Sequence, residues 1–254
     1  MGASPPERSR DEYREPLTAL GSETCRASVG HGHQGTRYRS EVDPVFERMR
    51  VEYRNLPLDR DQLDPDPFQQ FSRWMAEAER AGIEEPNAFV LSTADAAGRP
   101  SARTVLLKGL GAGGFEFFTN YRSRKAADMD ANPEVAAVFL WVPIRRQVRI
   151  EGRVSKVEQH ISDAYFASRP PESRLASVAS PQSQVVASRD ELEARLEELR
   201  RRYPDGHVPR PPHWGGYRID PLSFEFWQGR EARFHDRFRY RRDGRLWRIE
   251  RLAP

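Results

Sequence analysis

The sequence predicts an α+β fold that is mainly β, an antiparallel barrel with helical additions. Three observations support this class. About eight or nine short segments alternate apolar and polar residues with the period of two that is typical of strands. Most links between these segments have hairpin length, whereas parallel strands need crossovers of roughly a dozen residues or more. The predicted helices interrupt the strands without alternating with them regularly, which disfavours a parallel, doubly wound sheet.

The composition is compatible with one sizeable domain and disfavours several classes of protein. Of the 254 residues, 37% are hydrophobic and 31% are charged, and 41 basic residues nearly balance 38 acidic ones. The charges alternate along the chain, so the net charge of +3 does not favour a nucleic-acid-binding module. The lone Cys25 excludes an intramolecular disulfide framework and a cysteine-rich metal site, and we expect no bound metal. We expect no membrane association and a cytoplasmic location, because the sequence contains neither a membrane-length apolar stretch nor a secretory signal.

We divide the chain into a disordered N-terminal tail, residues 1–40, and a single domain, residues 41–254. The tail is rich in Gly, Ser, Arg and Pro and shows no strand or helix period. The ordered part is expected to begin with a short helix near Val45–Tyr53. A longer helix follows, with Asp66 as its N-cap and Pro67 in its first position. Its apolar stripe consists of Phe68, Phe71, Trp74, Met75 and Ala78.

The middle of the chain is predicted to contain strands joined by turns and by one short helix. Strands are expected at Ala88–Thr93 and Ala102–Lys108, with a turn between them. A third strand, Phe115–Thr119, follows the glycine-rich segment Gly109–Gly114. The remaining elements of this part are a helix from Ser123 through Asp130 and the strands Val135–Trp141 and Gln147–Val154.

Two helices and a second group of strands complete the predicted domain. A helix is expected from about Val157 to Ser168, followed by a polar link. A charged helix then opens with a capping box of Ser188 and Glu191. The last two strands are joined by a tight Asp243-Gly244 turn. The strands of this group are expected at Gly216–Ile219, Ser223–Gln228, Arg237–Arg242 and Leu246–Arg251.

The glycines Gly109, Gly111 and Gly114 have the spacing of a dinucleotide-binding fingerprint, but their context does not fit it. That fingerprint needs a helix behind it, because the helix N-terminus binds the pyrophosphate. The aromatic strand Phe115–Thr119 follows here, so we interpret the glycines as a hairpin turn. The sequence also contains no G-x-S-x-G elbow, H-E-x-x-H helix or Walker-type loop, which leaves hydrolases and nucleoside triphosphatases without their motifs.

Several groups of cations are candidates for ligand binding. Arg124 and Lys125 open a predicted helix, where they oppose the macrodipole unless an anion binds there; the pattern also allows a solvated basic turn. Strict alternation places Arg103 and Lys108 on opposite strand faces, so they cannot both serve one pocket unless the strand twists or bulges; two separate cation sets for two ligand phosphates would fit that parity. A further candidate is the pair Tyr165 and Arg169 on one helix face, with Ser173 just beyond the helix. Another is the set Arg233, His235 and Arg237, whose side chains share strand parity and can converge on one face.

In chain order, ten motifs of this sequence resemble the pyridoxamine 5′-phosphate oxidase family. The resemblance runs from about Arg50 to Pro254, and it is the order of the motifs that makes it specific. The motifs are Arg103–Lys108, Phe117–Asn120, Ser123–Lys125, Arg146–Val148, Tyr165–Pro170, Gln182–Ser183, Trp214–Gly216, Glu225–Gly229, Arg233–Arg237 and Arg251–Pro254.

The resemblance implies a split β-barrel that forms a homodimer, with two FMN sites at the subunit interface. It implies oxidation of pyridoxamine or pyridoxine 5′-phosphate to pyridoxal 5′-phosphate, with O2 as the final acceptor and H2O2 as a product. By position, Arg103, Arg124 and Lys125 would bind the flavin phosphate. The full set that matches flavin contacts is Arg103, Thr104, Val105, Leu106, Leu107, Lys108, Phe118, Thr119, Arg124, Lys125, Gln147, Gln182, Ser183, Trp227 and Arg237.

The resemblance also assigns residues to the substrate, a small phosphorylated pyridine. Arg233 and His235 match the catalytic pair beside the pyridine ring. Four residues match the set that binds the substrate phosphate: Lys108, Tyr165, Arg169 and Ser173. The other matches to substrate contacts are Phe234 and, in an N-terminal motif, Arg50 and Tyr53.

The sequence departs from the family pattern at four positions, which affect substrate preference more than the reaction. Ala232 stands where a polar residue is usual, and Phe234 replaces the commoner leucine. Arg174 and Val178 replace a glutamine and a tryptophan. Two alternatives therefore stay open: a sister split-barrel flavin oxidase acting on another ring, such as a phenazine precursor, and a non-enzymatic flavin- or heme-binding split barrel. The first would not need the phosphate-binding set, and the second would not need a catalytic pair.

Overall fold

The computed structural model describes residues 57–254, all of which belong to one compact unit. The predictions for the disordered tail, the short helix Val45–Tyr53 and the substrate contacts Arg50 and Tyr53 lie outside the described residues.

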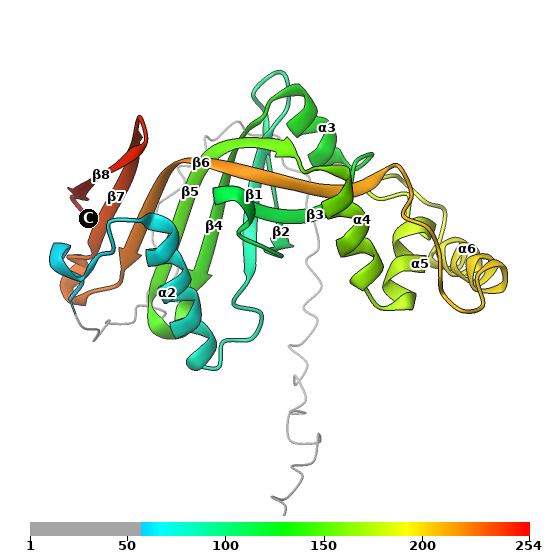
Figure 1. Ribbon diagram of the computed structural model, residues 1–254, viewed down its shortest axis with the longest axis horizontal. Coiled ribbons are helices and arrows are strands. Elements are labelled where there is room, and N and C mark those ends of the chain that lie inside the picture. The colour runs from blue at the N-terminus through cyan, green and yellow to red at the C-terminus, as the bar shows by residue number, and fades with distance from the viewer. Residues whose placement is uncertain (1–56) are drawn as a thin grey trace, which may run out of the picture. The chain divides into compact units, whose positions relative to one another are not determined.

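The described residues form one antiparallel sheet of eight strands (Figure 1). Neighbouring strands follow the order β2-β1-β4-β5-β6-β7-β8, and β3 pairs with β6 off this path, which curls the sheet into a split barrel. The predicted antiparallel fold with helical additions is confirmed. The strands are β1 (Ala88–Ala94), β2 (Pro100–Leu106), β3 (Phe115–Asn120), β4 (Glu134–Trp141), β5 (Arg146–Lys156), β6 (Trp214–Gln228), β7 (Asp236–Asp243) and β8 (Leu246–Leu252).

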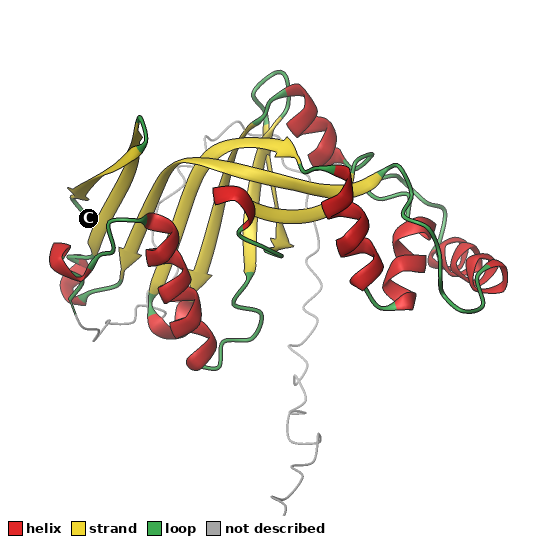
Figure 2. Ribbon diagram, in the orientation of Figure 1, coloured by secondary structure: helices red, strands yellow, loops and turns green. Residues whose placement is uncertain are grey.

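Within residues 57–254 five helices accompany the sheet, and α4, α5 and α6 gather beyond one end of it, near the start of β6 (Figure 2). The predicted start of α2 is confirmed, since the Asp66 carboxylate accepts a hydrogen bond from the Phe68 amide at 2.9 Å and Pro67 opens the helix. No helix in residues 57–254 is both long and apolar enough to cross a membrane. The helices are α2 (Pro67–Arg80), α3 (Arg124–Ala131), α4 (Gln159–Ser168), α5 (Pro171–Ala179) and α6 (Arg189–Arg202).

Aromatic side chains dominate the barrel core. Phe71 of α2 lies edge-on to Phe115 and Phe139, with ring centroids 4.9 Å apart in both pairs, and all three rings are completely buried. Each fully buried ring contributes roughly 1.5–3 kcal/mol through the hydrophobic effect, so α2 is firmly attached to the sheet. A second, smaller apolar cluster under α4–α6 contains Phe166, Leu175, Val208 and Trp214.

The two strands predicted at Gly216–Ile219 and Ser223–Gln228 are one continuous strand, β6. The pairing with β5 shifts at a β-bulge, where Glu151 lies opposite Ser223 and the next residue, Gly152, lies opposite Pro221. A Cβ atom on Gly152 would lie 2.2 Å from the Asp220 carbonyl oxygen, so only glycine allows this close approach. Proline usually ends a strand, but here the bulge accommodates Pro221 without a break.

The polar link predicted after Ser168 is wrong, because residues 171–179 form helix α5. Only two residues of this polar segment are buried, Arg174 and Leu175. The packing of Leu175 in the second apolar cluster stabilises the helix. Helix α6 begins as predicted, with the Ser188 hydroxyl accepting from the Glu191 amide at 3.2 Å. The return bond of the capping box goes to the amide of Ala187, one residue earlier than predicted.

Candidate functional site

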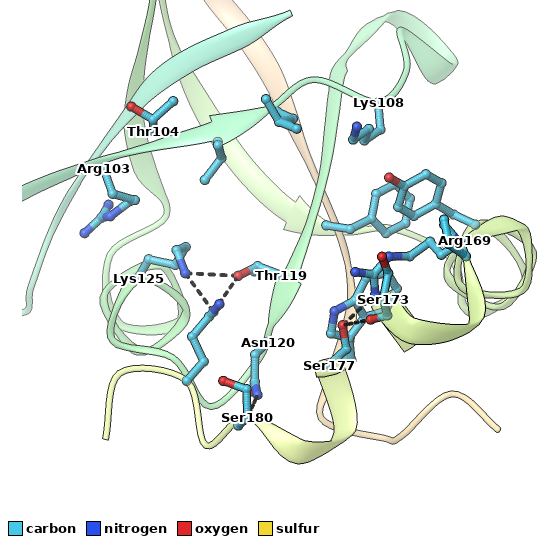
Figure 3. Close-up of a pocket in the computed structure, with 17 residues that line it drawn as sticks. Arg103, Thr104, Lys108, Thr119, Asn120, Lys125, Arg169, Ser173, Ser177 and Ser180 are labelled. Carbon is cyan, nitrogen blue, oxygen red and sulfur yellow. Dashed lines mark hydrogen bonds between the residues drawn. The ribbon is translucent and has the colours of Figure 1, made fainter. Parts of the chain in front are cut away.

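A pocket of about 530 Å³ lies between the edge strand β2, strand β3, helix α3 and the α4–α5 corner (Figure 3). Figure 3 shows Arg103 and Lys125 on one side of it and Lys108, Arg169 and Ser173 on the other. The structure therefore brings together most residues predicted for the two phosphates. The lining residues are Arg103, Thr104, Val105, Leu106, Lys108, Phe118, Thr119, Asn120, Lys125, Tyr165, Arg169, Pro170, Ser173, Ser177, Ser180, Gln182 and Trp214.

Strand β2 contributes four consecutive residues, Arg103–Leu106, to the pocket wall. It can do so because β2 stands at the edge of the sheet, where both faces and the free backbone groups are accessible. Strict alternation, which would separate Arg103 from Lys108, does not extend that far because β2 ends at Leu106. The Lys108 amide then bonds to the Glu116 carbonyl of the neighbouring chain segment at 2.8 Å. Both cations consequently line one pocket. From the sequence, this arrangement was expected only if the strand twisted or bulged.

Lys125 is the most constrained cation of the pocket. Its Nζ atom donates to Thr119 Oγ1 at 3.0 Å, to Gln182 Oε1 at 2.9 Å and to Ser123 Oγ at 3.3 Å. Ser123 occupies the N-cap position of α3, but its hydroxyl accepts from Lys125 and does not cap the helix. Burial, together with the nearby charge of Arg103, lowers the pKa of Lys125 to about 8. An anion bound here would remove that electrostatic cost.

Arg103 is held from behind by strand β1 and by its own strand. Nη1 donates to the Leu91 carbonyl at 3.1 Å and to Thr93 Oγ1 at 2.8 Å, while Nη2 donates to Ser101 Oγ. The charge of Arg124 acts on Arg103, although the exposed Arg124 side chain does not line the pocket. Leu107, which is buried, and Ser183, next to Gln182, do not line it either, although both were predicted to contact the flavin.

The other side of the pocket is formed at the corner between α4 and α5. Arg169, the residue that follows α4, donates from Nη1 to Ser177 Oγ at 2.6 Å and lies 4.8 Å above the Trp214 ring. Tyr165 stacks on Phe118, with ring centroids 4.0 Å apart. The predicted convergence of Tyr165 and Arg169 is confirmed, and Ser173 joins them because α5 starts immediately after the corner.

Sequence reasoning did not assign Trp214 or Ser177 to the site. Trp214 belongs to a motif that was recognised, but no ligand contact was assigned to it. Ser177 lies one helical turn after Ser173, whose carbonyl accepts its hydroxyl proton at 2.9 Å. That spacing becomes informative only when residues 171–179 are known to be helical, and they were predicted to be a polar link.

The remaining predicted residues form a second group, away from this pocket, on β5, β6 and β7. Gln147, Trp227 and Arg237 lie in one cross-strand row, because Trp227 is the register partner of both others. His235 lies against Trp227, with ring centroids 4.6 Å apart. Arg237 donates from Nε to Glu225 at 2.9 Å. None of these residues lines the pocket described above.

Arg233 and His235 lie near each other, but strand parity is not the reason. Arg233 ends a short 3-10 turn, η4 (Glu231–Arg233), in which Ala232 and Arg233 have φ angles of 51° and 61°. His235 Nδ1 accepts the Arg230 amide proton at 3.1 Å, so the neutral ring carries its proton on Nε2. Burial and the charge of Arg233 lower the pKa of His235 against the opposing effect of Asp236. Phe234 is 77% exposed.

Two family models match this chain, and together they cover most of it. Residues 75–203 match the model described as "Pyridoxamine 5′-phosphate oxidase". Residues 214–254 match the model described as "Pyridoxine 5′-phosphate oxidase C-terminal dimerisation region". The first stretch contains the whole pocket except Trp214, and the second contains Trp227, His235 and Arg237 of the other group.

Named relatives and solved structures agree with these matches. A pyridoxine/pyridoxamine 5′-phosphate oxidase of Rubrobacter xylanophilus is 55% identical over 206 residues, covering 81% of this chain and 95% of the relative. One of Bordetella pertussis is 56% identical over 207 residues, covering 81% and 98%. The crystal structure of PhzG from Burkholderia lata, in complex with tetrahydrophenazine-1-carboxylic acid, superposes with a TM-score of 0.73 at 32% identity, covering 76% of this chain and 95% of that one. An FMN-binding protein from Nostoc punctiforme shares the fold, with a TM-score of 0.61 at 20% identity and coverage of 76% and 100%.

Proposed function

Because the chain belongs to the pyridoxamine 5′-phosphate oxidase family, we propose that it binds FMN in the pocket beside β2 and oxidises pyridoxamine and pyridoxine 5′-phosphate to pyridoxal 5′-phosphate. The observation that carries this proposal is the presence of two separate cation sets in one pocket. One set serves the phosphate of the cofactor and the other serves the phosphate of the substrate.

The pocket fits a flavin phosphate on the side of Arg103 and Lys125. Lys125 is half-buried beside a second cation, and a bound anion would offset the desolvation and the repulsion from Arg103 that lower its pKa. Thr119 and Gln182 supply further polar groups, both already bonded to Lys125. The edge of β2 offers free backbone groups to the polar rim of a planar ring system.

Arg169, Lys108, Tyr165 and Ser173 bind the substrate phosphate in this proposal. Arg169 is already oriented by Ser177 and Trp214, so little conformational entropy is lost when the phosphate binds. The phosphate is remote from the reacting C4′ carbon, and its binding energy serves to place that carbon.

The protein provides placement and charge, since the redox chemistry belongs to the cofactor. FMN held beside Arg103 and Lys125 would supply the two-electron oxidation at C4′ and the reduction of O2 to H2O2. The alcohol substrate would give the aldehyde directly, and the amine would give it with uptake of one water and release of ammonia. Arg233 and His235 hold the pyridine ring. The tautomer of His235, with its proton on Nε2, makes this histidine a hydrogen-bond donor to the substrate.

The complete site requires two copies of the chain in this proposal. The group around Trp227 and His235 does not line the pocket of its own subunit. By their place in the family motifs, however, its residues correspond to ones that contact the flavin and the substrate. The row Gln147–Trp227 continues on the outer sheet face into Leu140, and Val90 lies on the same face as the register partner of Val138. Leu140 and Val90 are 58% and 40% exposed. A partner subunit that covers this apolar face would also bring its second group to the neighbouring pocket.

A hybrid dimer tests this arrangement. Arg169→Ala and Arg233→Ala subunits with different tags are co-expressed, and the mixed dimer is isolated. If each site takes Arg169 from one subunit and Arg233 from the other, one of the two sites regains both arginines. We expect kcat/KM per dimer to recover to about half of the parent value, measured by O2 uptake. Recovery no greater than in either parental variant would show that both arginines of a site come from one subunit.

The affinity for FMN is expected to depend on pH through Lys125. Its pKa of about 8 in the free protein means that it loses its charge as the pH rises past 8. A bound phosphate favours the charged form and raises this pKa, so binding takes up a proton at high pH and weakens. Between pH 7.5 and 9.5 the Kd for FMN should rise on the order of tenfold. Fluorescence quenching measures it, and Lys125→Arg, which stays charged, should give a flat profile.

The direct test of the proposed function uses the purified protein. It should be yellow and release FMN on denaturation, and it should consume O2 with pyridoxamine or pyridoxine 5′-phosphate. A protein that stays colourless when FMN is added would refute the assignment.

One observation favours an alternative, a sister oxidase that acts on another ring: the structure is similar to that of PhzG. The identity of 32% with that protein is well below the 55–56% with the two phosphate-ester oxidases. A substrate without phosphate would also leave the half-buried Arg169, beside Trp214, without an anion. A parent enzyme that prefers an unphosphorylated ring would decide for this alternative.

A further inference from the structure

A buried carboxylate lies behind Arg103, and none of the roles assigned above uses it. Asp128 of α3 is 6% exposed. Its Oδ2 atom accepts hydrogen bonds from Thr93 Oγ1 at 2.7 Å and from Ser101 Oγ at 2.8 Å. The nearest guanidinium nitrogen of Arg103 lies 3.7 Å from the same oxygen. The contact to Arg103 therefore runs mainly through the two hydroxyl groups.

The direction of these hydrogen bonds follows from the number of protons available. Each hydroxyl has one proton and can donate it once, and the lone pairs on its oxygen remain as acceptors. The carboxylate takes the protons of both Thr93 and Ser101, so both oxygens are left to accept from Arg103. Without the carboxylate, the hydroxyls can turn their protons toward the guanidinium or toward each other, since they lie 3.2 Å apart.

We propose that Asp128 is a positioning residue for the flavin phosphate, because it orients Thr93 and Ser101 and thereby fixes the guanidinium of Arg103. Asp128 does not contact the flavin. The inference rests on the proposed function, since it takes Arg103 as a ligand of the FMN phosphate.

The charge of Asp128 alone does not explain why it lies there. Burial opposes ionisation, but the bonds from Thr93 and Ser101 and the charges of Arg124 and Arg103 keep its pKa below the usual value. The group is therefore an anion at neutral pH, a few ångströms behind a site that binds another anion. Its Coulombic effect on a phosphate is unfavourable. Orientation of Arg103 is the effect that favours binding.

The test compares the affinities of FMN and riboflavin for the flavin-free, full-length protein, measured by fluorescence quenching. Riboflavin lacks the phosphate, so it does not report on Arg103. Asp128→Asn keeps an oxygen that accepts from both hydroxyls, and we expect its Kd for FMN to stay within about threefold of the parent. Asp128→Ala removes the acceptor and should raise the Kd for FMN on the order of ten- to thirtyfold. Riboflavin affinity should stay within about twofold in both.

Three further variants keep the inference falsifiable. Asp130→Ala removes an exposed carboxylate of the same helix and should change neither affinity. If Asp128→Ala fails to fold, Thr93→Val and Ser101→Ala each remove one oriented hydroxyl and should weaken FMN binding about three- to tenfold, without affecting riboflavin. Equal losses for Asn and Ala, or equal losses for FMN and riboflavin, would overturn the positioning role.

Lys125→Gln separates this inference from the proposed function. If it weakens FMN binding but not riboflavin binding while Asp128→Ala changes neither, the phosphate site stands and the role of Asp128 is refuted. If Lys125→Gln affects FMN and riboflavin equally, the phosphate assignment itself is refuted, and the inference with it.

Discussion

Lys125→Glu is expected to yield a folded protein that retains no flavin. The Nζ atom lies within 3.3 Å of three side-chain oxygens, so its position is fixed. Loss of one charge-assisted hydrogen bond costs roughly 1.5–3 kcal/mol. The new carboxylate adds repulsion of the phosphate, so the Kd for FMN should rise more than about a hundredfold. The protein should be colourless after purification, and added FMN at micromolar concentration should not restore its absorption spectrum.

Two controls define this result. Arg80→Glu makes the same change of charge on the exposed end of α2, away from the pocket, and should leave the protein yellow. Circular dichroism should show that Lys125→Glu has the secondary structure of the parent. A Lys125→Glu protein that still binds FMN with parental affinity would refute the phosphate site on α3.

Arg169→Ala and Arg233→Ala are expected to impair the enzyme in different ways. In the proposed function Arg169 binds the phosphate both before and during the reaction, so its loss should mainly raise KM. The rise should be about ten- to a hundredfold, the cost of losing charge-assisted bonds to a phosphate. Arg233 is proposed to place the ring against the flavin, and a misplacement of about 1 Å can cost about a hundredfold in rate. Arg233→Ala should therefore also lower kcat, and steady-state O2 uptake separates the two effects.

Substrates without phosphate provide the independent check. Pyridoxamine should be a poor substrate of the parent enzyme, and Arg169→Ala should harm its oxidation much less than that of the phosphorylated form. Arg200→Ala, on α6 and paired with Glu172 of the same corner, is the matched control and should change neither parameter. If Arg169→Ala impairs both substrates equally, the assignment of Arg169 to the phosphate is wrong.

Local signals predicted most of the elements that carry the site. The strands β1 to β5 and the start of α2 follow from alternation and from capping chemistry that acts over two or three residues. Helix α5 could not be predicted this way, because its stability depends on Leu175 packing against residues distant in the sequence. The continuity of β6 depends on Gly152, some seventy residues earlier, so no local pattern around Pro221 reveals it.

The candidate site shows the same division. Arg103, Lys125 and Arg169 could be identified from the sequence because each belongs to a short motif in a recognisable order. The network behind Arg103 could not, since Thr93, Ser101 and Asp128 lie in three different elements and meet only in the folded sheet. The separation of the Trp227 group from the pocket is likewise a property of the fold, because the sequence motifs assigned residues of both groups to the same two ligands.

The place of β6 between β3 and β5 has a consequence for the newly synthesised chain. Phe117 on β3 pairs with Tyr217 on β6, which lies 100 residues later in the chain. Until that segment has left the ribosome, β3 and β5 each present an unpaired edge, and such edges favour association between chains. Trp214, the first residue of β6, also belongs to the pocket wall. The nascent chain therefore cannot capture its cofactor before synthesis is nearly complete, and any product truncated before Trp214 is expected to aggregate without flavin.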